Sequence, residues 1–381
     1  MAKKNCSFSD NSSRGHIMWG KIKHWIEVRI GLEELTDKHL RSYKTPKGAN
    51  FMNTLGFVAL VAFIIQVITG IMLLLYYVPH PDYAFESVQT ITNDIPYGWL
   101  FRLIHNIGSN IIIGVIIIHL IHVFLRVSYK KPREITWISG CIMFFLVLLT
   151  SITGQLLPWH QTGFWQTTVT STIPAFLPVI GEGISSYMRG GEFVTGVTLS
   201  RYFSFHVVIL PVIICALIGM HVLLVRRQGI STSVIIEPES ETSHEDFHRE
   251  THSEGQPCFP HFSLKRLFMV MIYFAVIFFI MTFMPNLFLP PESNIPANPL
   301  MTPELIRPAW YFLAPYQLIK IIPNDLLGIS LLVIFSVFLL FWPFFDAKNT
   351  GRNISKRPLL LSLGLIVLAL WTILTIWGMY S

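Results

Sequence analysis

Charged residues are scarce in this chain. Asp, Glu, Lys and Arg make up 13% of its 381 residues and hydrophobic residues 52%, whereas soluble domains carry roughly 25% charged residues. Cysteine is also scarce, and no C-x-x-C spacing is present, which excludes a cysteine-ligated zinc site, an iron–sulfur cluster and a C-x-x-C-H haem attachment. Residues 1–50 lack the apolar core of a signal peptide. The composition indicates an integral membrane protein, and we expect residues 1–50 to form a retained cytoplasmic segment.

Seven long apolar runs predict seven transmembrane helices, because about 20 apolar residues in a helix cross the bilayer core. The predicted spans are Thr54–Val78, Trp99–Phe124, Trp137–Leu157, Phe203–Val225, Leu267–Leu289, Leu326–Phe345 and Leu359–Met379. We therefore expect an all-α membrane protein, with a four-helix bundle in residues 51–230 and three more helices in residues 263–381.

A polar stretch separates the two groups of spans. Residues 231–262 include His244, His248 and His252, whose spacing of four residues could bind a metal if the segment were helical. Such a composition cannot bury a core, so we favour a solvated linker.

Lysine and arginine are distributed unevenly between the loops, which predicts the orientation. Residues 1–50 and the loops after the second, fourth and sixth spans hold 23 of them. The opposite side holds Arg102, Arg189, Arg201, Arg307 and Lys320. Cytoplasmic loops carry the positive excess, so we expect a cytoplasmic N-terminus and a C-terminus across the membrane. This distribution accounts for the net charge of +6, so we expect no nucleic-acid partner.

Two predicted spans carry paired histidines. His105 and His119 are 14 residues apart in the second span, and His206 and His221 are 15 apart in the fourth. In an α-helix these intervals correspond to roughly 21–22 Å along the axis and to rotations of about −40° and +60°. Both spans run inward from the outer side, so His105 should lie level with His206, and His119 with His221. Imidazole is a common iron ligand, and the two levels predict two stacked bis-histidine haem sites.

A single intramembrane histidine need not bind haem. Any one of the four could be a hydrogen-bonded core residue or part of a proton path, since intramembrane ionisable residues serve several functions. Four at matched depths favour haem. His122 lies one turn beyond His119 and could compete with it as a ligand, but its 17-residue interval from His105 matches the fourth span less well.

Two pairs of glycines repeat the interval of the first histidine pair. Gly56 and Gly70 in the first span, and Gly140 and Gly154 in the third, are each 14 residues apart. Glycine lets a backbone approach a bulky planar group closely. Close packing of helices through small residues is the alternative.

These features resemble cytochrome b of the Rieske/cytochrome b quinol-oxidising complexes, of the bc and bf types. The segments similar to the family's four-helix unit are FIIQVITGIMLLLYYVP, FESVQTI, GWLFRLIH, YKKPREITWISG, TGQLLPWHQTGFW and VRRQGIS. The segment MTPELIRPAWYFLAPYQLIKIIPNDLLG resembles its three-helix unit. The two units are separate proteins in plastids and are fused here.

The resemblance implies two non-covalent b-type haems, the outer one held by His105 and His206 and the inner one by His119 and His221. It places Arg102 near a haem propionate. It places a quinone-reduction site at Arg226 on the inner side, and a quinol-oxidation site where PWHQTGFW meets RPAWYF on the outer side. The implied outer-site residues are Trp159, Pro308, Ala309 and Trp310.

Three positions depart from the family pattern. Thr54 stands where the photosynthetic branch attaches an extra haem through cysteine, so a covalent third haem is not implied. Ala309 replaces the glutamate of the Pro-Glu-Trp-Tyr motif, which ends here at Tyr311. His160 stands where relatives carry glycine or aspartate. A positioned base speeds proton transfer by typically 10²–10⁴, and we hypothesise that His160 or Glu304 supplies part of this function beside Tyr311.

The sequence thus predicts the di-haem cytochrome b subunit of a quinol-oxidising electron-transfer enzyme. It would pass electrons from the outer to the inner site, coupled to proton translocation. The expected partners are a Rieske iron–sulfur protein, a c-type cytochrome or similar acceptor, quinone, membrane lipid and a second copy of the complex. The fusion and the altered motif favour a bacterial inner membrane over an organelle. The alternatives are a di-haem anchor of a hydrogenase or formate dehydrogenase, and a proton-coupled transporter, which would be colourless.

Overall fold

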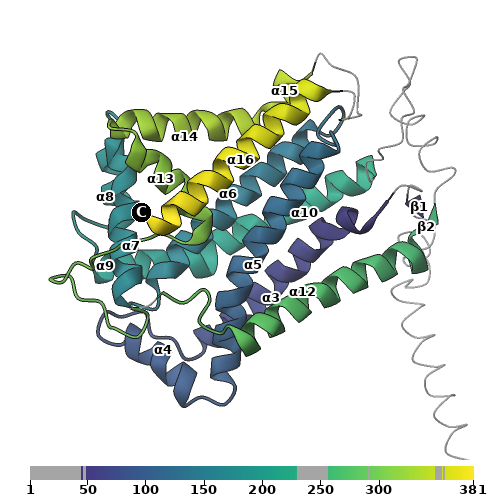
Figure 1. The fold of residues 1–381 in the computed structure, drawn as a ribbon. Helices are drawn as coiled ribbons and strands as arrows, with labels where there is room; N and C mark the ends of the chain where they lie inside the picture. The colour runs from purple at the N-terminus through teal and green to yellow at the C-terminus, as the bar shows by residue number, and fades with distance from the viewer. Residues whose placement is uncertain (1–43, 46–48, 230–255, 291, 348–353, 355–356) are drawn as a thin grey trace, which may run out of the picture.

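The computed structural model describes residues 44–45, 49–229, 256–290, 292–347, 354 and 357–381 (Figure 1). These residues are mostly helical, and two-residue strands β1 (Lys44–Thr45) and β2 (Gln256–Pro257) pair antiparallel. The long helices are α3 (Leu55–Leu74), α5 (Gly98–Leu125), α6 (Glu134–Leu156), α10 (Leu210–Gln228), α12 (Ser263–Phe283) and α16 (Pro358–Tyr380). The shorter α-helices are α4 (Ala84–Asn93), α7 (Gln161–Thr172), α8 (Gly181–Arg189), α9 (Gly196–Ser204), α13 (Leu313–Ile321), α14 (Asp325–Leu340) and α15 (Trp342–Phe345). The 3₁₀ segments are η2 (Phe51–Thr54), η3 (Ile173–Phe176) and η6 (Trp310–Phe312), and the π segments are η4 (Phe205–Ile209) and η5 (Cys258–Phe262). The predicted all-α class is confirmed.

Six helical stretches among the described residues are long and apolar enough to cross a membrane. They are Phe51–Leu74, Gly98–Leu125, Glu134–Leu156, Gly196–Gln228, Cys258–Phe283 and Pro358–Tyr380. Each coincides with a predicted span. The fifth ends six residues earlier than predicted, because Pro285 follows Met284 and the residue before a proline disfavours helical backbone.

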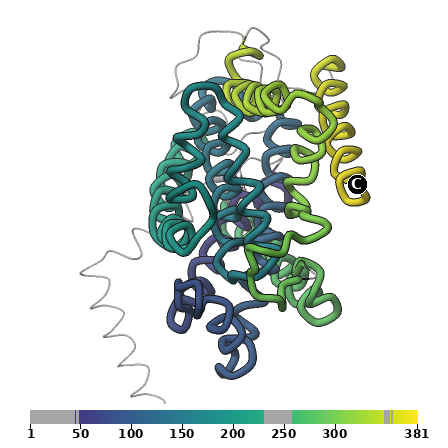
Figure 2. Tube along the Cα trace, turned by 90° about the vertical axis from the view of Figure 1, so that its left-hand side faces the viewer, coloured from purple at the N-terminus to yellow at the C-terminus, as the bar shows by residue number. Residues whose placement is uncertain are grey.

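The sixth predicted span, Leu326–Phe345, differs from the structure. Its sequence forms α14, which has 16 residues, followed by α15. Pro343 in α15 has no backbone N–H, so one continuous helix is not favoured. A 16-residue helix is about 24 Å long and the bilayer core about 30 Å thick. Figure 2 shows α14 lying across one end of the molecule, whereas α16 runs along its side. A seventh span there stays a prediction.

The long helices pack in neighbouring pairs. Helix α3 packs on α5, α6 packs on α10, and α5 also contacts α6. Helix α12 lies against α3 and α5, which brings the second unit onto the first (Figure 1). The largest buried cluster, which includes Val58, Ile107 and Ile277, lies at this contact.

The two units are also joined by polar contacts from the loop between α5 and α6 and from the start of α6. The Tyr129 hydroxyl donates to Asp346 Oδ2 over 2.7 Å, and Lys130 Nζ forms an ion pair with the same oxygen at 2.8 Å. Arg357 binds both carboxylate oxygens of Asp346. The Trp137 indole donates to the Leu339 carbonyl over 2.9 Å. We call Tyr129, Lys130, Asp346 and Arg357 the loop clamp.

A π turn lies where α9 passes into α10. In η4 the Leu210 N–H bonds to the Phe205 carbonyl, five residues back. Pro211 follows immediately. A proline inside a helix has no N–H to donate and clashes with the carbonyl four residues earlier. A wider turn relieves this conflict and places one extra residue in the helix.

Candidate functional site

The structure brings the four predicted histidines together in two levels. We call the level of His105 and His206 the outer level, after the orientation that the sequence predicts. Its two rings are 6.2 Å apart between centroids, at an interplanar angle of 76°. At the inner level His119 and His221 are close enough to interact electrostatically. The pairing by depth is the one that the sequence predicts.

The π turn explains how unequal intervals give matched levels. His206 lies within η4, and His221 is 15 residues further on. Because η4 takes up one extra residue, the interval acts as about 14 α-helical residues, with the same rotation of about −40° as between His105 and His119. In a regular α-helix His221 would be rotated by about +60° from His206 around the axis. The histidines of the two helices would then not match in direction.

Three of the four imidazoles are oriented by hydrogen bonds between Nδ1 and groups on neighbouring helices. His105 Nδ1 lies 2.9 Å from Thr69 Oγ1, and His221 Nδ1 lies 2.8 Å from Ser139 Oγ. His206 Nδ1 donates to the Thr150 carbonyl over 2.9 Å. These bonds fix ring orientation and leave Nε2 available to bind a metal, as in many metal-binding histidines.

The predicted glycines lie directly against these rings. A Cβ at Gly70 would lie 3.3 Å from His105 Cε1, and one at Gly154 would lie 2.6 Å from His206 Cε1. At the inner level Gly56 faces His119 and Gly140 faces His221 in the same way. The planar group beside each glycine in this structure is therefore an imidazole.

Buried polar atoms remain at the inner level. His119 Nδ1 and His122 Nε2 are buried with no hydrogen-bond partner among the described residues, as is Arg126 Nε. The two histidines belong to the last two turns of α5, and Arg126 follows that helix directly. Such atoms require a polar partner. A ligand bound at this end of α5 could supply hydrogen-bond partners for them.

The two outer loops meet through backbone hydrogen bonds. Gln161 N–H donates to the Ile295 carbonyl over 2.9 Å, and Ala297 N–H donates to the Trp159 carbonyl over 3.1 Å. The Gln161 amide adds bonds to Asn298 N–H and the Met301 carbonyl. PWHQTGFW therefore contacts the segment that precedes RPAWYF, and Gln166, the residue after PWHQTGFW, donates to the Arg307 carbonyl at the start of RPAWYF. A quinol site between the two motifs stays a prediction.

His160 caps helix α7. Its Nδ1 accepts from the Gly163 N–H over 2.9 Å, and the side chain is buried. Burial, followed by the positive charge of Arg102, lowers the pKa of His160 to about 4. One ring nitrogen is therefore already bonded and the imidazole is a weak base, which weakens the hypothesis that His160 is the outer base.

Tyr311 lies in the 3₁₀ segment η6, and its hydroxyl faces α6. It is 6% exposed and hydrogen-bonded to Ser151 Oγ, with Gln155 Nε2 at 3.5 Å. Burial raises the pKa of Tyr311, and the bonds from Ser151 and Gln155 offset part of this rise. Tyr311 is therefore a neutral hydroxyl at ordinary pH.

The remaining predicted residues are distributed around these centres. Arg102 lies one turn before His105 in α5 and donates to Thr92 Oγ1 over 2.6 Å. Pro308, Ala309 and Trp310 are half-buried and lead into Tyr311. Glu304 is exposed on the loop, and Arg226 is exposed near the end of α10. Thr54 is buried and caps its own turn through the Phe51 carbonyl. His244, His248 and His252 lie outside the described residues, as do residues 1–43.

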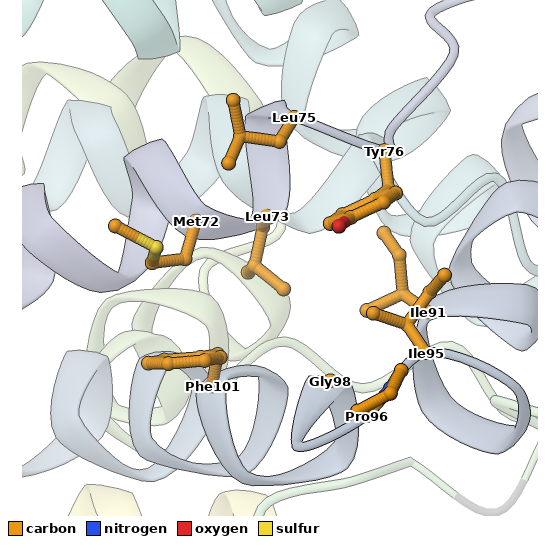
Figure 3. Close-up of a pocket in the computed structure, with 9 residues that line it drawn as sticks. All are labelled: Met72, Leu73, Leu75, Tyr76, Ile91, Ile95, Pro96, Gly98 and Phe101. Atoms are coloured by element: carbon orange, nitrogen blue, oxygen red, sulfur yellow. The ribbon is translucent and has the colours of Figure 1, made fainter.

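A cavity of about 130 Å³ opens elsewhere, between the end of α3 and the start of α5. Figure 3 shows its apolar lining, which includes Met72, Tyr76, Ile91 and Phe101. None of the four predicted ligands lines it.

Comparisons with known proteins agree with this arrangement. The family model described as cytochrome b/b6/petB matches residues 40–229, and the model described as cytochrome b (C-terminal)/b6/petD matches residues 296–381. Cytochrome b of Rickettsia typhi is 36% identical over 351 residues, which cover 92% of this chain and 84% of that relative. The chain belongs to the cytochrome b family. Cytochrome b of Dictyostelium discoideum is 35% identical over 315 residues, 83% of this chain and 77% of the relative.

A solved structure supports the same conclusion for the fold. A chain of a hyperthermophilic respiratory complex III superimposes with a TM-score of 0.86 at 36% identity, covering 94% of this chain and 91% of that one. Both cytochrome b units lie in one chain here, so the predicted fusion is confirmed.

Cytochrome b proteins bind b-type haem, and the histidine levels fit this group. The ring centroids of His105 and His206 are 6.2 Å apart, so an iron between them could bind a nitrogen of each ring. No group of three or more His, Cys, Asp or Glu side chains gathers as a metal site in the described part of the chain. The histidine pairs are the candidate iron ligands because imidazole is a common ligand for iron.

Several small polar residues that hold the site residues in place were not predicted from the sequence. Thr69, Thr150, Ser139 and Ser151 lie within apolar spans. Thr69 and Ser139 lie one residue before Gly70 and Gly140. A polar residue beside a glycine at the ligand interval is the signal that could have identified these two.

Proposed function

We infer that this protein is the di-haem cytochrome b subunit of a quinol-oxidising respiratory complex. Its outer site oxidises quinol, its inner site reduces quinone, and electrons pass between them with coupled proton translocation. The observation that carries this proposal is the pair of histidine levels, each backed by glycine, in a chain of the cytochrome b family.

Some of the described residues would hold the haems, and others orient the histidines that hold them. His105 and His206 would hold the outer haem, and His119 and His221 the inner one. A bound b-type haem supplies reversible one-electron transfer. The Nδ1 bonds of His105, His206 and His221 fix these imidazole planes, and Arg102 lies one turn from His105, where its charge can pair with a carboxylate.

The outer and inner sites take different residues. We assign the outer quinol site to Trp159, Pro308, Ala309, Trp310 and Tyr311, where the two outer loops meet. Arg226 at the end of α10 is the candidate for the inner quinone site. Within the described residues no cluster of cysteines or histidines could hold an iron–sulfur centre, so a Rieske protein and a c-type acceptor are the proposed partners.

A reduced-minus-oxidised spectrum of the purified chain tests the haem assignment. The wild type should bind two haems per chain. His206→Leu and His221→Leu should each remove about half of the absorbance, since each histidine would hold one of the two haems. His119→Leu should behave likewise, whereas His122→Leu should keep both haems. A colourless wild-type protein would instead favour a transporter.

A further inference from the structure

The outer site presents a chemical problem that rests on the proposed function. Ala309 stands in the position of the motif glutamate and has no group that can bind a quinol hydroxyl. The Nδ1 of His160 is bonded to Gly163, and Glu304 is exposed. Within this site the buried polar group on the motif itself is the Tyr311 hydroxyl.

The Tyr311 hydroxyl is held by one face of α6. Ser151 and Gln155 are four residues apart and therefore lie on the same side of that helix. Ser151 Oγ bonds to the hydroxyl, and Gln155 Nε2 points its N–H toward it from 3.5 Å. Tyr311 also packs in the buried cluster at the contact of the two units, so its ring has little freedom to move.

The bonding capacity of these groups leaves one position open on Tyr311. A phenol hydroxyl has one donor and two acceptor sites, an amide N–H can only donate, and a serine hydroxyl can do either. If Tyr311 donates to Ser151 and accepts from Gln155, one lone pair stays free for a donor such as quinol. If Ser151 turns and donates, the O–H of Tyr311 becomes free for an acceptor such as quinone.

The same turn of α6 also orients an iron ligand. The Thr150 carbonyl, next to Ser151 in the chain, accepts from His206 Nδ1. Thr153 Oγ1 lies 3.4 Å from the same nitrogen. A single helical turn therefore fixes both the Tyr311 hydroxyl and the imidazole of His206.

We propose that Ser151 is a positioning residue for the outer quinol site, acting through Tyr311. Its reversible hydroxyl lets Tyr311 accept a hydrogen bond from bound quinol and donate one to the quinone product. Ser151 thereby supplies the polar adaptability that Ala309 lacks. Tyr311 touches the substrate, and Ser151 does not.

Steady-state kinetics of the assembled complex with a decyl-substituted benzoquinol test this proposal. Ser151→Ala should lower kcat/KM about three- to tenfold, the effect of losing one uncharged hydrogen bond. Ser151→Thr keeps the hydroxyl and should restore kcat/KM to within about twofold. In the Tyr311→Phe background, Ser151→Ala should have no further effect, because the two residues act as one unit.

Ser336→Ala in α14 is the matched control, because that hydroxyl bonds only within its own helix, to the Leu332 carbonyl. It should leave kcat/KM unchanged. An unchanged Ser151→Ala protein, a Ser151→Thr protein as slow as Ser151→Ala, or additive effects with Tyr311→Phe would each overturn the proposal. The haem spectrum of every variant is recorded alongside. A normal b-type spectrum with one of these kinetic results refutes the role of Ser151 alone, whereas a wild type without haem refutes the proposed function.

Discussion

Replacing Asp346 with asparagine should destabilise the fold by weakening the contact between the two units at the loop clamp. The carboxylate accepts from Tyr129 and pairs with both Lys130 and Arg357. Asparagine has nearly the same size and can still accept a hydrogen bond, but it carries no charge. The Lys130 and Arg357 cations would then lose their shared anion in a buried place.

The burial of the loop clamp sets the magnitude. The side chains of Asp346, Lys130 and Arg357 are 5%, 8% and 12% exposed, so water screens the charges little. Removing one partner of a buried ion pair costs about 3–5 kcal/mol. Asparagine keeps hydrogen bonds worth ~1 kcal/mol each, so we expect a loss near the lower end, about 3 kcal/mol.

The effect should depend on pH in one direction. Burial acts to raise the pKa of Asp346, but the bonds from Arg357, Lys130 and Tyr129 outweigh it and hold the pKa well below its ordinary value. A carboxyl with a depressed pKa stabilises the fold above its unfolded-state pKa, about 3.9. The difference between wild type and Asp346→Asn should therefore be constant from about pH 5 to pH 8, where the carboxyl is ionised in both states, and shrink below about pH 4.

Unfolding in mixed detergent micelles, followed by tryptophan emission as the denaturing detergent is increased, measures this loss. Asp82→Asn is the matched control, because Asp82 is 77% exposed and should change stability by less than about 0.5 kcal/mol. An Asp346→Asn protein as stable as the control would refute the expected loss. Simple additivity of Asp346→Asn and Arg357→Gln would refute it too, because charges in contact must couple.

Two further predictions concern the ligand levels and the outer loop. Gly154→Ala should reduce binding of the outer haem, because its Cβ would come within 2.6 Å of His206. Gly114→Ala is the control: its Cβ meets nothing within 4 Å, so it should leave the reduced spectrum intact. Equal reduced spectra for the two variants would contradict this prediction. His160→Asn keeps a good helix cap, and the imidazole with its pKa of about 4 is neutral above that pH. The rate profile between about pH 5.5 and 8 should therefore keep its shape, and the disappearance of a titration step near pH 6–7 would count against this.

The approach of the two histidine pairs could be predicted because it follows from intervals along helices. His105 and His206 are far apart in the chain, but their depths are fixed by the rise of each helix and the direction of each span. The meeting of the outer loops also followed from the motifs around Trp159 and Trp310. These features depend on regular geometry or on short segments with a recognisable pattern.

The features that could not be predicted from the sequence depend on tertiary contacts. The loop clamp joins Lys130 to Asp346, more than 200 residues away, and no local pattern marks that pair. The bond between Ser151 and Tyr311 depends on the placement of α6 beside η6. The shortness of α14 depends on Pro343, which a count of apolar residues does not register.

The π turn at η4 affects how chains of this family should be compared. In an alignment with a relative whose two histidines are 14 residues apart, the additional residue between His206 and His221 would be treated as an insertion. In three dimensions the surplus is absorbed in the turn that Pro211 forces, before the chain reaches His221. Residues on the two sides of that turn therefore keep equivalent positions around the helix, and the gap belongs within Phe205–Ile209.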